Sequence, residues 1–211
     1  DDFYYCPGWD EVLVTEINLM NHKNYYLSST MVGAGQVQFD AGETTETFDE
    51  SKLLKNLENI KTFNFQGTTK CPGLIHKSIW KKVGGWSEEF SPTGGDDTDF
   101  AMKLWKSDVR IFKGINDFKV YHFGSIVSRK YKNHPTIITE SGSKGSKIFL
   151  LKWGISIKFF KKYFLKSDQV YDGQLKNPKI TLIYLFKLFV CKLFFFYTKL
   201  IYKYKSNLYR S

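Results

Sequence analysis

The chain has 211 residues, enough to bury a hydrophobic core, and its 42% hydrophobic content excludes general disorder. Its formal charge of +10 is unevenly distributed, because residues 1–141 hold 16 basic and 19 acidic residues (−3) whereas residues 142–211 hold 15 and 2 (+13). Three widely spaced cysteines exclude a disulfide framework and a cysteine zinc site, and they favour a reducing, cytoplasmic compartment.

The first 70 residues alternate between strand-like and helix-like patterns. The chain opens with a strand end that runs into a turn at Pro7-Gly8, and a short helix is expected from Asp10. Residues 25–37 are expected to form a strand or an irregular loop. Residues 48–51 should cap a helix that covers one face of a sheet, with leucine and isoleucine at helical spacing in Leu53, Leu54, Leu57 and Ile60.

The next 70 residues predict two short helices and two strands. A turn at 71–73 precedes a helix at 75–83, which ends at a glycine pair suited to the left-handed cap. A second helix is expected at 99–107. Strands are expected at 109–112 and 118–123, where β-branched and aromatic residues gather.

The last 70 residues predict a basic helical extension, so we divide the chain into a domain at 1–141 and an extension at 142–211. Residues 141–146 are rich in Gly, Ser and Lys, which is typical of a linker, and residues 147–166 predict one basic amphipathic helix. Residues 180–202 are long enough to span a bilayer, but Lys187 and Lys192 would each cost about 3 kcal/mol near its centre. A helix that lies on the surface is therefore favoured.

Aromatic and basic residues together would also suit a nucleic-acid partner. Here the aromatics stand in continuous apolar runs such as Phe194-Phe195-Phe196, not interleaved on a basic face. We therefore predict no nucleic-acid partner and a peripheral membrane contact through residues 147–205. The alternative is a helical cap that packs on the domain.

Asp96, Asp97 and Asp99 stand between a glycine turn and an amphipathic helix start, and Asp1-Asp2 opens the chain. Ordinary N-capping explains one acidic residue at such a place. Three carboxylates exceed that need, because like charges raise one another's pKa unless a cation or a donor offsets them. The pattern points to metal-assisted group transfer.

Several segments resemble the family 2 glycosyltransferases of the GT-A fold, and in particular a subgroup common in viral and environmental sequences. They are Ser-Ser-Thr-Met at 28–31, His-Lys-Ser-Ile-Trp at 76–80, Phe-Ser-Pro at 90–92, the acidic segment at 97–105 and Val-Tyr-His-Phe-Gly-Ser at 120–125. The resemblance covers about residues 1–130. It implies an α/β fold with a GT-A-type mixed sheet, of which this chain is the C-terminal, acceptor-side part, the nucleotide-binding half being expected before Asp1.

The resemblance also implies a metal and donor site. Asp2 would bind Mn²⁺ or Mg²⁺ on the diphosphate of a nucleotide-sugar donor, with Asp1 nearer the ribose or the metal. His122 resembles the histidine that completes the metal or pyrophosphate site, although a lone histidine at a strand end is often only a satisfied structural residue.

An acceptor site is implied by the later motifs. Asp97 would be the general base, with Asp96 as its rival, and Asp99 would contact the acceptor or orient the helix. Trp86 would stack on an acceptor sugar, or else belong to the core.

Together these features predict a metal-dependent, inverting glycosyltransferase that acts on a glycan or lipid-linked acceptor. Two alternatives remain. One is a non-catalytic module that binds a glycan or a partner in a larger glycan-assembly protein. The other is a membrane-tethering protein whose carboxylates only cap helices.

Overall fold

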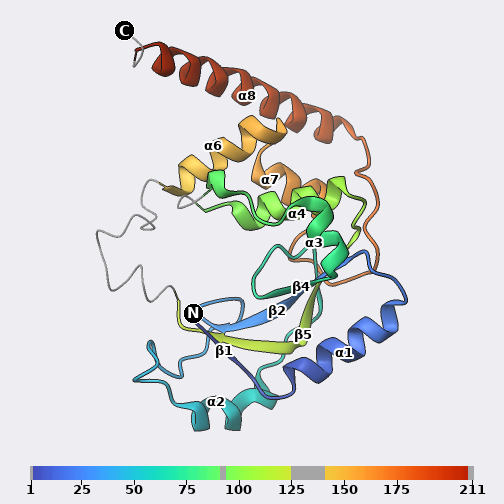
Figure 1. The fold of residues 1–211 in the computed structure, drawn as a ribbon, viewed down its shortest axis with the longest axis vertical. Helices are drawn as coiled ribbons and strands as arrows, with labels where there is room; N and C mark the ends of the chain where they lie inside the picture. Colours follow the sequence, from blue (N-terminus) through green and yellow to red (C-terminus); the bar gives the residue numbers. More distant parts are fainter. Residues whose placement is uncertain (1, 91–93, 125–140, 209–211) are drawn as a thin grey trace.

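The computed structural model describes residues 2–90, 94–124 and 141–208, and its architecture is mixed α/β, with helices on both sides of a curled sheet (Figure 1). The strands are β1 (Phe3–Tyr5), β2 (Tyr25–Gly33), β3 (Phe65–Gln66), β4 (Gly73–Ile75) and β5 (Ile111–His122). The helices are α1 (Trp9–Met20), α2 (Glu50–Asn56), α3 (Lys77–Val83), α4 (Asp96–Lys106), α6 (Ser141–Trp153), α7 (Ile157–Phe160) and α8 (Leu182–Leu208), with short turns η1 (Leu57–Asn59), η2 (Glu88–Phe90) and η3 (Lys161–Leu165). The expected α/β class is thus confirmed.

The sheet is mixed and is built around β5. Its order is β1-β5-β2-β4, and β3 also pairs with β5. β2 and β5 run parallel, whereas the other pairs are antiparallel. Because β2 is covered on both faces, it is a nearly continuous run of buried residues, as expected for a central strand.

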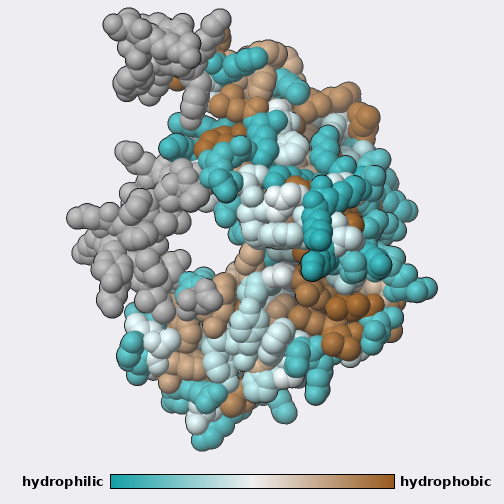
Figure 2. Space-filling view, viewed as in Figure 1, coloured by the Kyte–Doolittle hydropathy of each residue, from teal (hydrophilic) through white to brown (hydrophobic). Residues whose placement is uncertain are grey.

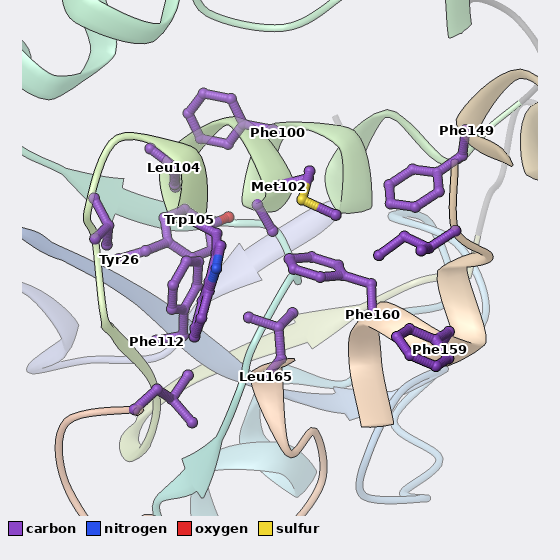
Figure 3. Close-up of a cluster of buried hydrophobic side chains, with 14 of the residues drawn as sticks. Tyr26, Phe100, Met102, Leu104, Trp105, Phe112, Phe149, Phe159, Phe160 and Leu165 are labelled. Atoms are coloured by element: carbon purple, nitrogen blue, oxygen red, sulfur yellow. The ribbon is translucent and has the colours of Figure 1, made fainter. Parts of the chain in front are cut away.

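Three hydrophobic clusters hold the helices on the sheet. α1 packs on one side through Leu13, and α2 packs near it through Leu53 (Figure 1). The largest cluster lies on the other side and joins the sheet to α4, with Phe100, Leu104 and Trp105 at helical spacing against Phe112 (Figure 3). The expectation that the helix after residue 50 covers a sheet face agrees with this packing.

The helices after residue 141 complete the largest cluster. Phe149 of α6, Phe160 of α7 and Leu165 of η3 are fully buried and point toward α4 in Figure 3. α8 contributes Cys191 to the same cluster. One core is therefore shared by residues on both sides of 141.

Two expectations about the region from 96 to 123 are wrong. The helix expected from Asp99 begins at Asp96, behind Gly95 at φ 95°, so all three aspartates lie in its first turn. The two strands expected at 109–112 and 118–123 are a single strand. The polar segment between them stays in the sheet because neighbouring side chains satisfy its backbone: Thr30 donates to the carbonyl of Ile115 (2.9 Å), and the amide of Asn116 donates to Asn64 (2.8 Å).

Two expectations about the C-terminal region are also wrong. Residues 141–146 are not a linker but the first turns of α6, where Gly145 is buried beside Gly95. The single helix expected at 147–166 is interrupted at Gly154, which has φ 71°, and restarts after Ser156, whose side chain caps α7. Across residues 2–90, 94–124 and 141–208, no helix has the length and apolar content needed to cross a membrane.

Candidate functional site

The carboxyl ends of the two parallel strands, β2 and β5, meet at one edge of the sheet. Gly33 at the end of β2 lies opposite His122 at the end of β5. A pocket of about 420 Å³ opens there, lined by residues of both strand ends and of the 38–43 loop: Gly33, Ala34, Gln38, Phe39, Asp40, Gly42, Glu43, Tyr121, His122 and Phe123. In open α/β sheets, ligands bind at such strand ends.

β1 brings Asp2 to this edge. The antiparallel register places Phe3 opposite His122, and the Phe3 ring stacks on the imidazole with a centroid distance of 4.9 Å. The Nε2 atom of His122 is 3.1 Å from Oδ2 of Asp2. The pair joins residues 120 positions apart and is partly buried.

The contact of the other imidazole nitrogen, Nδ1, shows that this atom carries a hydrogen. Nδ1 of His122 is 2.5 Å from the carbonyl oxygen of Ala34. A carbonyl oxygen can only accept, so Nδ1 carries the hydrogen and donates. In a neutral imidazole Nε2 then presents a lone pair, and this lone pair faces the Asp2 carboxylate. The contact needs a positive charge between the two atoms, which is either a proton on Nε2 or a bound cation.

The donor atoms fit a divalent ion. Two adjacent ligands about 2.1 Å from an octahedral ion are roughly 3.0 Å apart, close to the observed separation of Asp2 and His122. The backbone bond from Nδ1 to Ala34 is the outer partner typical of metal-binding histidines. Carboxylate suits Mg²⁺ and Mn²⁺, whereas imidazole suits transition metals, so the pair fits Mn²⁺ better than Mg²⁺.

The protein supplies few metal ligands beside Asp2 and His122. Among the described residues, no group of three or more His, Cys, Asp and Glu side chains could hold a metal ion. Asp1, expected near the ribose or the metal, lies outside the described residues. A cation on Asp2 and His122 would therefore be completed by water and by substrate oxygens, as is usual for ions that bind phosphates.

Gly33 and Tyr121 shape the pocket wall. A Cβ atom on Gly33 would lie 2.8 Å from the carbonyl oxygen of His122 and 2.9 Å from the Tyr121 ring, and its φ of 89° also favours glycine. The Tyr121 hydroxyl accepts from the amide of Ala41 (2.9 Å) and donates to the carbonyl of Gly42 (2.8 Å). Tyr121 thus holds the 38–43 loop beside the histidine.

Asp97 occupies a second, separate place at the first turn of α4. Its Oδ1 accepts a weak hydrogen bond from the Cys71 thiol at 3.4 Å. Burial, and after it the charge of Asp96, raise the pKa of the Asp97 carboxyl from 3.8 to about 6, against a smaller lowering by the hydrogen bond from the Cys71 thiol. Burial and the nearby Asp97 also raise the pKa of the Cys71 thiol to about 12, so this thiol is not a nucleophile at neutral pH. A carboxylate with a pKa near 6 suits a general base.

The two acidic places lie along one strand but do not touch. The amide of Ser29 in β2 donates to Pro72, the residue after Cys71. His122 lies opposite Gly33 of the same strand. Along β2, the position of Pro72 beside Ser29 and that of His122 beside Gly33 are thus four residues, or about 13 Å, apart.

Asp99 is expected to contact an acceptor or to orient the helix, and the structure shows that it does not face solvent. Its side chain is fully buried, and both oxygens are bonded within the protein. Ser87 donates to Oδ2 (2.6 Å), the indole Nε1 of Trp153 donates to Oδ1 (2.6 Å), and the Lys152 ammonium lies 3.0 Å from Oδ1. Asp99 therefore anchors α4 to α6 and offers no oxygen to an acceptor.

The sequence reasoning missed Lys152 and Trp153. Both lie in the basic extension, where a lysine and a tryptophan match the overall composition, and no local signal marks them as partners of Asp99. Trp86, expected to stack on a sugar, instead packs on Phe100 with a centroid distance of 4.5 Å and belongs to the rim of the largest cluster.

The structure thus brings Asp2 and His122 together, sets Asp96 and Asp97 at one end of α4, and buries Asp99 between helices. Comparisons of the chain with protein-family models, with curated proteins and with solved structures found no match. A function for this chain must therefore come from its own motifs and geometry.

Proposed function

We propose that the chain is the acceptor-side part of a metal-dependent, inverting glycosyltransferase with a GT-A-type sheet, which uses a nucleotide-diphosphate sugar as its donor. The observation that carries the proposal is the Asp2–His122 pair, whose carboxylate oxygen and Nε2 atom lie 3.1 Å apart at the ends of the parallel strands and would fit a cation in place of a proton. The three cysteines are free thiols, which fits a cytoplasmic enzyme.

In this proposal the residues divide into two groups. Asp2 and His122 hold the cation, which would neutralise the leaving diphosphate. Asp97 accepts the proton of the acceptor hydroxyl as that oxygen attacks the sugar carbon, and Asp96 keeps the Asp97 carboxyl basic through its charge. A single displacement assisted by one base inverts the configuration of the sugar carbon. The acceptor is a glycan or a lipid-linked sugar.

Two further observations, which do not involve the contact between Asp2 and His122, support the proposal. The segments at 28–31, 76–80 and 97–105 stand in the order that the family resemblance requires. The 420 Å³ pocket beside His122 is of a size that suits a small ligand.

Manganese binding by the 211-residue chain is the direct test. Titration calorimetry with Mn²⁺ should show one site, and Asp2→Asn and His122→Gln should each weaken it by at least tenfold. Asp10→Asn and His22→Gln, which change an exposed carboxylate and an exposed histidine elsewhere, are the matched controls and should bind as the wild type does. Equal affinity in all five proteins would contradict the metal site.

Transfer from a panel of nucleotide sugars, measured with the full-length parent that carries the expected nucleotide-binding half, tests the chemistry. With Mn²⁺ present, Asp97→Asn should lower turnover about 10²- to 10⁴-fold without changing the affinity for Mn²⁺. Metal binding without any transfer or donor hydrolysis would instead favour a non-catalytic module that binds sugar nucleotides.

A further inference from the structure

One face of α8 is an apolar seam that no described residue covers. Its members recur at intervals of four and three residues, so they form one stripe along the helix. They are 54% to 86% exposed and are Leu182, Phe186, Phe189, Leu193, Phe196 and Leu200. Figure 2 shows brown, apolar atoms along α8 at the top of the molecule. Contiguous exposed apolar surface of this kind marks an interaction site.

Packing of the opposite face fixes the direction of the seam. Tyr184, Leu188 and Cys191 lie on the inner side of α8 and contact the largest hydrophobic cluster, and Thr198 is also buried. These positions are about half a turn of helix away from the seam. The seam therefore points away from the domain and cannot be buried by a small rotation of α8.

The seam is bordered by positive charge alone. α8 contains no Asp or Glu in its 27 residues; Lys192 and Lys199 lie on one flank of the seam, and Lys187 lines the groove on the other side of the helix. A groove of about 780 Å³ runs beside it between α6, α7 and α8. It is lined mainly by apolar side chains together with Lys147, Lys158, Lys162 and Lys187, and none of its described lining residues is acidic.

The groove also contains an unsatisfied polar group. Tyr163 lines it, and the Tyr163 hydroxyl is buried with no hydrogen-bond partner among the described residues. A buried hydroxyl without a partner costs about 1–3 kcal/mol. A rotation that turned this hydroxyl toward the groove would let an ester or phosphate oxygen supply the missing bond.

We propose that α8 seats the protein on an anionic lipid bilayer, with the seam in the interface, the flanking lysines at the lipid phosphates, and one acyl chain in the groove between α6, α7 and α8. Charge complementarity selects this occupant over a second copy of the chain. Two seams facing each other would bring lysines from both copies together with no carboxylate on either α8. An anionic surface instead pairs with these lysines. The proposal does not depend on glycosyl transfer.

Vesicle flotation of the full chain tests this surface. The protein should float with vesicles of phosphatidylcholine and phosphatidylglycerol but not with phosphatidylcholine alone. Phe189→Ser combined with Leu193→Ser should weaken binding by more than tenfold, because two apolar side chains leave the interface. Lys192→Gln combined with Lys199→Gln should weaken it about 25-fold, or fivefold per lysine.

Matched controls use exposed residues far from α8. Val14→Ser combined with Leu19→Ser removes two exposed apolar side chains from α1, and Lys55→Gln combined with Lys81→Gln removes two exposed lysines; both proteins should bind as the wild type does. Absence of flotation, equal binding to both kinds of vesicle, or equal loss in the controls would overturn the proposal. So would a wild-type dimer in sedimentation that the Phe189→Ser, Leu193→Ser protein loses, because the occupant would then be a second copy.

Discussion

The indole Nε1 of Trp153 donates a 2.6 Å hydrogen bond to Oδ1 of Asp99, which joins α6 to the first turn of α4. The Lys152 ammonium contacts the same carboxylate and also lies 2.6 Å from Glu89. Asp96 and Asp97 share that first turn with Asp99. Two residues 53 and 54 positions away from Asp99 therefore hold the acidic turn in place.

Trp153→Phe should destabilise the protein by about 1.5–3 kcal/mol, because a hydrogen bond to a buried charge is lost while most of the ring packing remains. Denaturant unfolding measures the change. Trp9→Phe is the control, since Trp9 is partly exposed and makes no hydrogen bond from its indole among the described contacts. Equal losses for the two variants would show that the bond to Asp99 contributes nothing.

Lys152→Met should cost roughly 3 kcal/mol, the lower end of the range for breaking a buried ion pair, because Lys152 itself keeps some contact with solvent. The cost arises from the uncompensated charge of Asp99. Adding Asp99→Asn should therefore recover most of the loss, and Lys81→Met on an exposed face should change little. If the double variant is as unstable as Lys152→Met, packing and not charge explains the effect.

Asp97→Asn should stabilise the protein at neutral and alkaline pH. The pKa of this carboxyl is raised from 3.8 to about 6, so the folded state favours the protonated form. The stabilisation from protonated Asp97 is complete below about pH 4 and is lost as the pH rises through about 6. Relative to the wild type, Asp97→Asn should gain up to about 3 kcal/mol above about pH 7 and nothing below about pH 4.

The free energies of unfolding of the wild type and of Asp97→Asn, measured below about pH 4 and above about pH 7, give this difference. Asp10→Asn, on the exposed first turn of α1, serves as the control and should show no gain at either pH. A gain that does not depend on pH would mean that the Asp97 side chain is strained and not merely charged.

Gly33→Ala should disturb the candidate metal site, whereas Gly84→Ala should not. Both glycines have positive φ, at 89° and 73°, so each alanine costs about 1–2 kcal/mol in the backbone. Only at Gly33 would the new Cβ also meet the His122 carbonyl and the Tyr121 ring. We expect Gly33→Ala to unfold more easily than Gly84→Ala and to bind Mn²⁺ at least tenfold more weakly. Equal Mn²⁺ affinity in the two variants would separate Gly33 from the histidine site.

Local signals in the sequence predicted local structure well. Asp49 was expected to cap a helix, and its carboxylate accepts the amide of Lys52 at 2.8 Å. Gly84 was expected to end one, and it adopts the left-handed conformation at the end of α3. Both signals act within four residues, so they do not depend on the rest of the fold.

Predictions from sequence composition are wrong where a distant segment supplies the hydrogen-bond or packing partner. Composition places Gly145 in a linker, but this residue is buried in α6, and its backbone lies 3.6 Å from the position a Cβ would take on Gly95, which is ordinary van der Waals contact. The sequence predicts separate strands at 109–112 and 118–123, but the residues between them continue the strand, and Thr30 and Asn64 bond to the backbone of Ile115 and Asn116. The bonds of Asp99 to Trp153 and Lys152 depend in the same way on tertiary structure, which a sequence pattern does not contain.

α6 contacts both regions for which roles are proposed, because Trp153 near its end reaches Asp99 while Leu150, one turn earlier, lines the groove beside α8. The two contacts lie on one short, continuous helix, so the acidic turn and α8 are both packed against α6. Whatever surface α8 rests on would thereby also determine the direction from which a substrate approaches Asp97.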